Sequence, residues 1–202
     1  MKAKRKNTFM NETNIIGKPR VIRVHFTSPF RLDINLGKAY NQAMKKIGEY
    51  DWMCFTDYDV LFLTPNSKKI IINCCKHAPE GTGLLTCFTN RIHPISKGQL
   101  LHGLSENSDI REHIKIAIEQ ELVPLRFSML NYKVSGFLMC INKKVWEALG
   151  GFSETGEALG VDTDFCSRLL ERKFKIYRMN QVYVWHTYRL IQGIDNKEHL
   201  KK

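Results

Sequence analysis

The stretch DWMCFTDYDVLFLTP, residues 51–65, decides the fold class. It is almost entirely apolar until acidic residues interrupt it, and such a run is typical of a strand that is buried on both faces of a sheet. The sequence therefore predicts one strand over residues 51–65, lying inside an α/β sheet.

Further elements are expected on both sides of this strand. Strands are predicted over 19–29, 83–88 and 135–141, and one or two more over 175–186. Helices are predicted over 35–47, 67–77, 110–122 and 143–149, with another that begins at Asp162. Strands and helices alternate, so we predict a single compact α/β domain over residues 19–190, with a central mixed sheet flanked by helices. A flexible basic lead is expected over 1–18 and a basic tail over 191–202.

Composition and charge narrow the class of protein. The chain has 202 residues, 43% of them hydrophobic, with 31 Lys and Arg against 20 Asp and Glu. This composition excludes intrinsic disorder for the bulk of the chain, and no stretch approaches the roughly 20 apolar residues of a membrane span. The first residues lack the apolar core of a secretory signal. The formal net charge of +11 favours an anionic partner, such as a phosphate ligand, a nucleic acid or an acidic membrane surface.

The cysteines are predicted to be reduced. Most lie in apolar runs, where a free cysteine behaves as a small hydrophobic side chain, and none has the spacing of zinc ligands. With no export signal, they indicate a cytoplasmic protein. The six are Cys54, Cys74, Cys75, Cys87, Cys140 and Cys166.

The acidic pair Asp57 and Asp59 is the sharpest chemical feature. Two carboxylates two residues apart on an extended chain point to the same side. Buried like charges repel unless a cation lies between them, and Mg²⁺ and Mn²⁺ prefer oxygen ligands. The sequence therefore favours a divalent metal site, with an ordinary turn at the strand end as the alternative.

Three later residues add to this pattern. Asp162 and Asp164 flank the start of a helix, where their spacing places them on different faces. The structural alternatives are a helix cap for Asp162 and a first-turn carboxylate for Asp164. His186 ends an apolar strand, where a packed core histidine is the alternative to a metal ligand.

Together these segments resemble the GT-A-fold glycosyltransferases, closest to the family 2 type. Such enzymes show an N-x-G…A…N helix, a strand that ends in DxD, a small-residue strand, a GGF-[DS]-E turn, an acidic helix start and a distal histidine. The corresponding residues here are Asn35-Leu36-Gly37 with Ala39 and Asn41, Asp57-Tyr58-Asp59, Ser135-Gly136-Phe137, Gly150-Gly151-Phe152-Ser153-Glu154, Asp162-Thr163-Asp164 with Arg168, and His186. The resemblance covers about half of the chain.

The resemblance implies a GT-A-like, Rossmann-like fold and transfer of a sugar from a nucleotide-sugar donor, a UDP-, GDP- or dTDP-sugar. It implies that Asp57 and Asp59, completed by His186, hold Mn²⁺ or Mg²⁺. Asp162 would deprotonate the acceptor hydroxyl, and the sugar would be transferred with inversion. The acceptor would be a glycan, a lipid-linked molecule or a protein.

The resemblance also suggests which residues bind each substrate. Donor contacts are expected from Thr27, Ser28, Phe30, Asn35, Gly37, Asn41 and Tyr58. Contacts to the acceptor or the sugar are expected from Asn90, Arg91, Gly136, Gly151 and Asp164. Basic residues such as Arg31, Lys38 and Arg189 could add phosphate contacts.

The chain departs from the family pattern in three places. Val161 stands where a glutamate usually precedes the base, and Lys173 stands where a glycine often follows the helix. Typical members have two strand–helix units before the DxD strand, whereas here only the stretch from 19 to 56 precedes Asp57 within the expected domain. We therefore expect an abbreviated nucleotide pocket, with donor recognition altered, weakened or completed by a partner chain.

Two other functions compete with this one. A nucleotidyltransferase or nuclease could use Asp57, Asp59, Asp162 and Asp164 around two ions, and the positive charge would suit nucleic acid. Because no basic–aromatic motif for RNA or DNA is present, a nucleic-acid partner is not expected. The third function is a catalytically inactive binding module of the same fold. A membrane surface stays open as a partner, which would make the protein peripheral to the inner face of a membrane.

Overall fold

The structure is a computed structural model that describes residues 21–29, 32, 35–92, 98–101, 109–155 and 160–187. The predicted lead over 1–18 and the predicted tail over 191–202 lie outside these residues. In chain order the elements are β1 (Val24–Thr27), α1 (Leu36–Met44), β2 (Trp52–Thr56), β3 (Val60–Phe62), α2 (Ser67–Lys76), β4 (Thr82–Thr89), α3 (Ile110–Glu121), β5 (Phe127–Leu130), β6 (Leu138–Asn142), α4 (Lys143–Ala148), α5 (Val161–Glu171) and β7 (Lys175–His186). No helix in the described ranges is long and apolar enough to cross a membrane.

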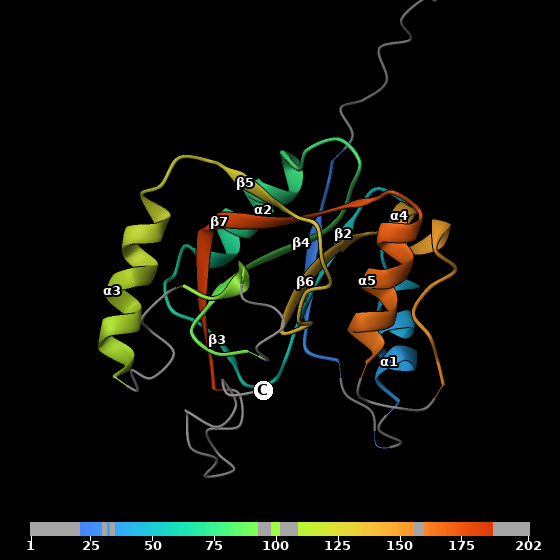
Figure 1. The fold of residues 1–202 in the computed structure, drawn as a ribbon, viewed down its shortest axis with the longest axis horizontal. Helices are drawn as coiled ribbons and strands as arrows, with labels where there is room; N and C mark the ends of the chain where they lie inside the picture. Colours follow the sequence, from blue (N-terminus) through green and yellow to red (C-terminus); the bar gives the residue numbers. More distant parts are fainter. Residues whose placement is uncertain are drawn as a thin grey trace, which may run out of the picture.

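All seven strands belong to one mixed sheet in the order β1-β2-β6-β4-β7-β3, with β5 paired to β7 (Figure 1). β1 is parallel to β2, and β4 is parallel to β7. β6 runs antiparallel to both of its neighbours, β2 and β4. The predicted mixed sheet within an α/β domain is therefore confirmed.

The sheet is strongly curled into half a barrel. β1 and β3 stand at opposite ends of the strand order. Even so, the rings of Phe26 on β1 and Phe62 on β3 lie 6.2 Å apart in an edge-to-face contact. The ammonium group of Lys68 on α2 lies 5.4 Å from each ring. The curl thus brings the two ends of the sheet together beside α2.

A bend in β7 helps to produce this curl. Its pairing with β4 shifts between Cys87 and Phe88, whose partners on β7 are Met179 and Tyr183. This bulge lets the first half of β7 pair with β5 and the second half with β3. The change of direction is visible in Figure 1. As a result, the last residue of β7, His186, is carried to the end of the sheet where β3 begins.

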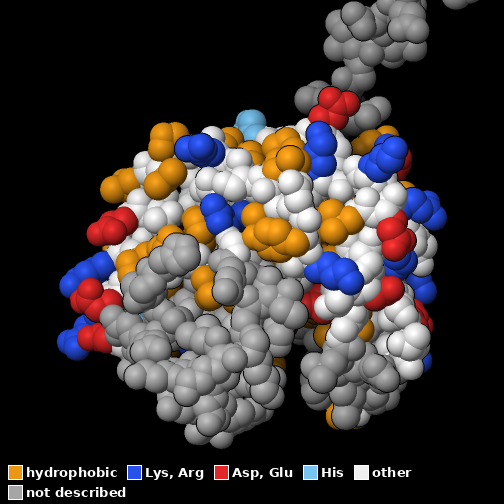
Figure 2. Space-filling view, in the orientation of Figure 1, with side chains coloured by type: hydrophobic (Ala, Val, Ile, Leu, Met, Phe, Trp, Pro, Cys, Tyr) orange, Lys and Arg blue, Asp and Glu red, His pale blue; other side chains and the backbone are white. Residues whose placement is uncertain are grey.

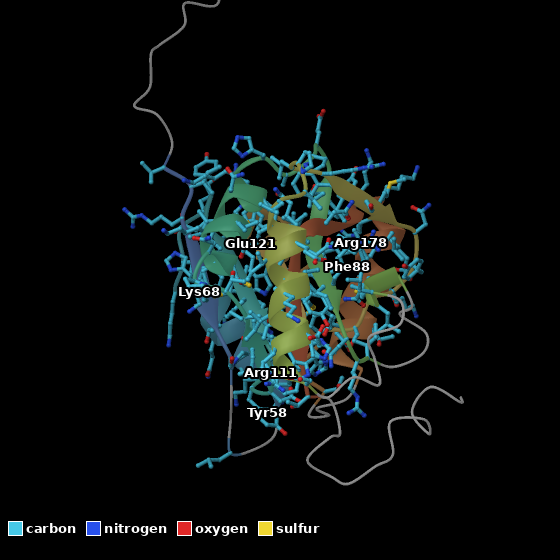
Figure 3. The ribbon with its side chains drawn as sticks, turned by 90° about the vertical axis from the view of Figure 1, so that its left-hand side faces the viewer. Tyr58, Lys68, Phe88, Arg111, Glu121 and Arg178 are labelled. Atoms are coloured by element: carbon cyan, nitrogen blue, oxygen red, sulfur yellow. The ribbon has the colours of Figure 1, made fainter. Side chains whose placement is uncertain are left out.

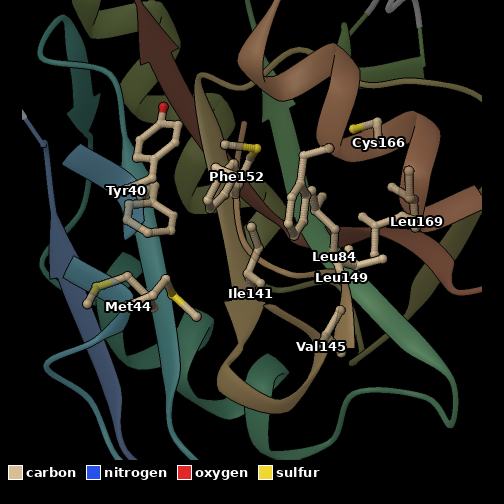
Figure 4. Close-up of a cluster of buried hydrophobic side chains, with 14 of the residues drawn as sticks. Tyr40, Met44, Leu84, Ile141, Val145, Leu149, Phe152, Cys166 and Leu169 are labelled. Atoms are coloured by element: carbon tan, nitrogen blue, oxygen red, sulfur yellow. The ribbon is translucent and has the colours of Figure 1, made fainter. Parts of the chain in front are cut away.

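The helices cover the sheet from several sides. Side chains of α1, α4 and α5 pack with the sheet in one core cluster, shown in part in Figure 4. Those of α2 pack into a second cluster together with Trp52, Leu138 and Val184. α3 contributes Ala117 to a small third cluster with Phe88 and Tyr183. The six cysteines are buried and free, as predicted, and burial raises the pKa of Cys166 to about 12.

Most of the predicted elements are present, with changes at their boundaries. The structure contains all five predicted helices. The predicted strand over 19–29 is confined to Val24–Thr27, and residues 175–186 form one strand rather than two. The strand over 135–141 begins later, at Leu138, since Ser135 and Gly136 form part of a loop. β5 was not predicted, because its four residues lack a clear alternation of buried and exposed positions.

Candidate functional site

The topology places the candidate residues at one edge of the sheet. Parallel strands end at the same edge, and an antiparallel strand begins where its neighbours end. The carboxyl ends of β1, β2, β4 and β7 and the amino end of β6 therefore meet. Next to these ends lie Ser28, Asp57, Asn90, His186 and Gly136.

The acidic pair lies in a turn and not in an extended strand. β2 ends at Thr56, and β3 begins at Val60 after a turn in which the amide of Val60 donates to the carbonyl oxygen of Asp57 at 3.3 Å. The prediction of a single strand over 51–65 is therefore wrong. The turn separates two segments with different partners, since β2 pairs with β6 whereas β3 pairs with β7. The two carboxylates nevertheless converge, together with His186, in one group whose ligand atoms lie within 4.8 Å of one another.

His186 is held in a fixed orientation. Its ring donates from Nδ1 to the carbonyl oxygen of Arg91 at 2.9 Å, because a carbonyl oxygen can only accept. Its backbone amide donates to Oδ1 of Asn90 at 2.8 Å. The ring stacks on Phe137 with centroids 5.3 Å apart, and its side chain is only 3% exposed. These contacts leave Nε2 as the ring atom that faces the carboxylates.

The electrostatics of this group call for an added positive charge. Nε2 of His186 lies 3.3 Å from Oδ1 of Asp59 and 3.7 Å from Oδ2 of Asp57. A neutral ring would direct its lone pair at two negatively charged groups. Either a proton on Nε2 or a cation among the three side chains relieves this repulsion.

The two carboxylates differ in their environment. Burial raises the pKa of Asp57, and the charges of Asp59 and Asp162 add to the rise, while His186 opposes it. Burial also raises the pKa of Asp59, but the hydrogen bonds from His186 and Thr187 outweigh it, so that this pKa is lowered overall. Thr187 donates from Oγ1 to Oδ2 of Asp59 at 3.0 Å. Asp59 therefore carries the more stable negative charge.

The donor set fits a divalent metal ion. Two carboxylates and a neutral imidazole nitrogen are ligands that Mn²⁺ and related ions accept. The hydrogen bond from Nδ1 to Arg91 is the kind of outer contact that orients a ligating histidine. Asp57, Asp59 and His186 thus form a candidate metal centre.

Asp162 lies at the start of α5 and faces the loop before β6. The amide of Gly136 donates to its Oδ2 at 2.7 Å, and the amide of Thr163 donates to its Oδ1 at 2.8 Å. The residue after Gly136, Phe137, accepts from the amide of Asp57 at 2.9 Å, so one loop joins Asp162 to the acidic turn, and the charge of Asp162 adds to the raised pKa of Asp57. The helix cap is Gly160, with φ of 86°, so Asp162 is inside the first turn and is not the cap. As predicted, Asp162 and Asp164 point to different neighbours.

The loop that positions Asp162 is itself anchored by Gln99. The Gln99 side chain is fully buried, and its Oε1 accepts from the amide of Ser135 at 2.8 Å. Its Nε2 donates to the carbonyl oxygen of Ser135 at 3.1 Å and to Oγ1 of Thr86 at 2.7 Å. This clamp fixes Gly136, the next residue, against the carboxylate.

The predicted donor-binding residues separate into two places. Ser28 bonds to Oγ1 of Thr56 at 2.8 Å, directly before the acidic turn, and Thr27 pairs with Phe55. Tyr58 is 86% exposed and points outward at the lower end of the molecule (Figure 3). Phe30 lies outside the described residues, as do Arg31 and Arg189.

The other predicted donor residues lie in a packing joint between α1 and the turn at 150–154. Asn35 caps α1, and its Nδ2 donates to the carbonyl oxygen of Glu154 at 3.4 Å. Asn41 accepts from the amide of Phe152 and donates to its carbonyl oxygen. A Cβ on Gly37 would lie 1.8 Å from the carbonyl oxygen of Ser153. This geometry gives them a structural role, and their contact with a donor stays a prediction.

The predicted acceptor residues are also divided. Asn90 and Arg91 are buried beneath His186 and support it. Gly151, with φ of 85°, belongs to the packing joint, where only a residue without a side chain fits against Asn41. Asp164 accepts from Nη2 of Arg168 at 2.7 Å, and Arg168 in turn donates to the carbonyl oxygen of Gly151. Gly136 bonds directly to the predicted base, because its amide donates to Asp162.

Three residues at or beside the candidate site were given no role from the sequence. Tyr40 belongs to the apolar stripe of the helix predicted over 35–47, Gln99 lies between the elements predicted over 83–88 and 110–122, and Thr187 follows the strand predicted over 175–186. Only for Tyr40 could the sequence have indicated a polar role, because it is the one residue of that stripe whose side chain carries a hydroxyl group.

Comparison with protein-family models, with curated proteins and with solved structures returned no match for this chain.

Proposed function

We propose that the protein is a metal-dependent glycosyltransferase with a GT-A-like fold, which transfers a sugar from a nucleotide-sugar donor to an acceptor hydroxyl with inversion. The observation that carries this proposal is the proximity of two unlike groups at one sheet edge. One is the candidate metal centre of Asp57, Asp59 and His186. The other is Asp162, a separate carboxylate close enough for its charge to act on Asp57.

The sheet supports the finer fold assignment. A GT-A-like arrangement requires the acidic turn at the carboxyl end of one strand and the small-residue loop before the antiparallel strand beside it. Here the amide of Asp57 donates to the carbonyl oxygen of Phe137 at 2.9 Å, which joins these two segments. β6 is antiparallel to β2, so both segments lie at the same edge.

The metal centre would serve the donor. Asp57, Asp59 and His186 would hold Mn²⁺ or Mg²⁺. Such an ion, when bound, neutralises the charge that grows on a departing diphosphate. Ser28 and Thr56 lie beside the centre and offer hydroxyl groups to a donor bound there.

Asp162 would act on the acceptor. Its carboxylate accepts the proton of the acceptor hydroxyl while that oxygen forms a bond to the anomeric carbon. The bond from the anomeric carbon to the diphosphate oxygen breaks on the opposite face, which inverts the configuration. The amides of Gly136 and Thr163 hold the carboxylate in place and leave lone pairs on both oxygens for the proton.

The two-ion nuclease has less support from the geometry. It needs Asp164 beside the other carboxylates, whereas Asp164 is bonded to Arg168 on α5. Lys and Arg side chains are also dispersed among acidic and apolar ones on the face shown in Figure 2. A nucleic acid would need a continuous basic track.

Proton NMR tests the proposal directly. The protein is incubated with UDP-glucose, UDP-N-acetylglucosamine, GDP-mannose or dTDP-glucose, with Mn²⁺ or with EDTA. We expect Mn²⁺-dependent release of one nucleoside diphosphate, with water as the acceptor and a product of inverted anomeric configuration. Asp162→Asn should slow the release about 10²–10⁴-fold.

The other functions predict different results. Cleavage of oligonucleotides in Mn²⁺ without any release of nucleotide from the sugars would favour the nuclease. Binding of a nucleotide without release, equal in the wild type and in Asp162→Asn, would favour an inactive binding module.

A further inference from the structure

We propose that the hydroxyl group of Tyr40 contacts the transferred sugar and helps to select it, by donating a hydrogen bond to one sugar hydroxyl. This inference rests on the proposed function, because it assigns a residue to the sugar subsite of that same site. Tyr40 lies in α1, between Ala39 and Asn41, and is not itself one of the residues that match the family's helix motif.

The ring of Tyr40 is rigidly placed. The residue is 3% exposed, and its ring lies 4.5 Å from the ring of Phe55 and 4.7 Å from that of Phe152, measured between centroids. Phe152 stacks in turn on Phe165 of α5 at 4.3 Å. Phe55 lies two residues before Asp57, so the same packing that fixes Tyr40 ties it to the strand that leads to the metal centre.

The hydroxyl group of Tyr40 has no hydrogen-bond partner among the described residues, yet it is not sealed from solvent. A buried tyrosine normally bonds its hydroxyl to the protein. Tyr183 shows the ordinary case, with its hydroxyl 2.6 Å from Nδ1 of His113. In Figure 4 the Tyr40 hydroxyl points out of the cluster, away from the buried side chains. It is thus available to a ligand.

The position of this hydroxyl relative to the acidic groups is informative. Burial raises the pKa of Tyr40 well above its ordinary value, and the charges of Asp57 and Asp162 raise it further. Those two carboxylates belong to the two halves of the proposed site, so the hydroxyl lies near enough to both for their charges to act on it. It stays protonated at any physiological pH and can donate.

The chemistry of the surroundings indicates the class of ligand group. Ionised carboxylates only accept hydrogen bonds, whereas the phenol of Tyr40 offers a proton. One ligand group that satisfies both is a hydroxyl, because it accepts from Tyr40 and donates to a neighbouring carboxylate. In the proposed function the diphosphate lies at the metal centre and the acceptor at Asp162, so the group between them is the sugar.

Tyr40→Phe tests this inference, because it removes the hydroxyl and keeps the ring. Isothermal titration in Mn²⁺ measures the Kd of UDP, GDP and dTDP and of their sugars UDP-glucose, UDP-N-acetylglucosamine, GDP-mannose and dTDP-glucose. We expect a loss of about 3- to 10-fold in affinity for the preferred nucleotide-sugar and no change for its nucleoside diphosphate. Tyr177→Phe is the control, because Tyr177 lies on β7 and packs on Phe127 away from the site.

Each other outcome is decisive. Equal loss for the nucleotide and the nucleotide-sugar, or no loss for either, would overturn the assignment of Tyr40 and leave the proposed function standing. If the wild type binds none of these compounds in Mn²⁺, the proposed function fails and this inference fails with it. A melting temperature equal to that of the wild type verifies that Tyr40→Phe is folded.

Discussion

His186 donates from Nδ1 to the backbone carbonyl oxygen of Arg91, and this bond of 2.9 Å determines what its other nitrogen can do. Nε2 is turned toward Asp59 at 3.3 Å and cannot rotate away without breaking the bond to Arg91. Stacking on Phe137 reinforces the orientation. The histidine is therefore preorganised either to carry a proton between two carboxylates or to bind a metal ion with them.

Replacing His186 by asparagine should separate these roles. The asparagine amide can still donate to the carbonyl oxygen of Arg91, but it has no counterpart of Nε2. We expect Mn²⁺ affinity to fall by about 10-fold or more, because one ligand is lost, and the melting temperature without metal to fall as well, because the stack on Phe137 is lost. Titration followed by electron paramagnetic resonance measures the free ion.

His77→Asn serves as the control for that experiment. His77 is exposed at the end of α2, and its ring bonds only to the carbonyl oxygen of Asn73 in the described structure. Equal Mn²⁺ affinity in His186→Asn and in the wild type would exclude His186 from the metal centre.

Asp57→Asn should stabilise the metal-free protein. The pKa of Asp57 is raised in the folded state by burial and by Asp59 and Asp162, so its ionised form opposes folding near neutral pH. For a raised pKa, the favourable contribution is present below the unfolded pKa and is lost as the pH rises through the folded pKa. The side chain is 40% exposed, so solvent screens the effect.

We therefore expect the melting temperature in EDTA at pH 7 to rise by about 1–2 °C in Asp57→Asn, and the difference to vanish at low pH. Added Mn²⁺ should stabilise the wild type more than the variant. A lower melting temperature for Asp57→Asn in EDTA at pH 7 would contradict the proposed repulsion.

Gly136→Ala should disable Asp162 without touching the metal centre. A Cβ on Gly136 would lie 2.8 Å from Cβ of Asp162 and 3.0 Å from its Oδ2, so the carboxylate would have to move. We expect the rate of sugar transfer to fall about 10²-fold, as for loss of a general base, with unchanged Mn²⁺ affinity.

A double variant gives the control for this prediction. If Gly136→Ala acts through Asp162, it should cause little further loss in an Asp162→Asn background. Full additivity of the two losses would show that Gly136 acts on the reaction by another route.

Asp51 lies at the end of β2 opposite the acidic turn, and we expect it to make the stability of the fold depend on pH. It accepts from the amides of Arg23 and Gly48 and from Nε2 of His25 at 3.0 Å. Burial raises its pKa, but these hydrogen bonds outweigh burial and lower the pKa below its ordinary value. For a lowered pKa, the stabilisation is present above the unfolded pKa and is lost as the pH falls through the folded pKa.

Asp51→Asn should accordingly lower the free energy of unfolding by about 1–3 kcal/mol at pH 7. The deficit should shrink as the pH is lowered toward 3, since the wild type then loses its own stabilisation. Urea unfolding at both pH values measures this, with exposed Glu80→Gln as the control. A deficit that stays constant between pH 7 and pH 3 would show that the charge of Asp51 is not what stabilises the fold.

Local sequence patterns predicted most of the helices and strands but not where β2, the strand that contains Cys54, ends. The helices followed from their apolar periodicity, and Asn35 and Asp109 cap two of them by accepting from the amides of Lys38 and Arg111. The apolar run at 51–65 concealed a turn, because both halves are largely apolar but pair with different strands. Only the curl of the sheet, a long-range property, separates them.

The site shows the same difference between features that a local pattern predicts and features that depend on long-range packing. Asp57 and Asp59 were identifiable because a pair of acids interrupts an otherwise apolar run, and His186 because it closes another apolar run. Asn41 was assigned to the donor, yet its side chain bonds to Phe152 and Trp146, contacts that no local pattern reveals. Tyr40 packs on Phe55 and Phe152, and Gln99 anchors the loop beside Asp162, through contacts across more than one element.

The central claim is that Asp57, Asp59 and His186 bind a divalent ion that the protein uses to hold a nucleotide. A thermal-shift panel of UDP, GDP, dTDP and CDP, each with Mn²⁺, Mg²⁺ or EDTA, tests it most directly, because ligands that bind only the folded state raise its melting temperature. The account predicts that one nucleotide raises the melting temperature of the wild type only with a metal ion, and that Asp59→Ala abolishes this rise. A rise that persists in EDTA or in Asp59→Ala, or no rise with any nucleotide, would contradict it.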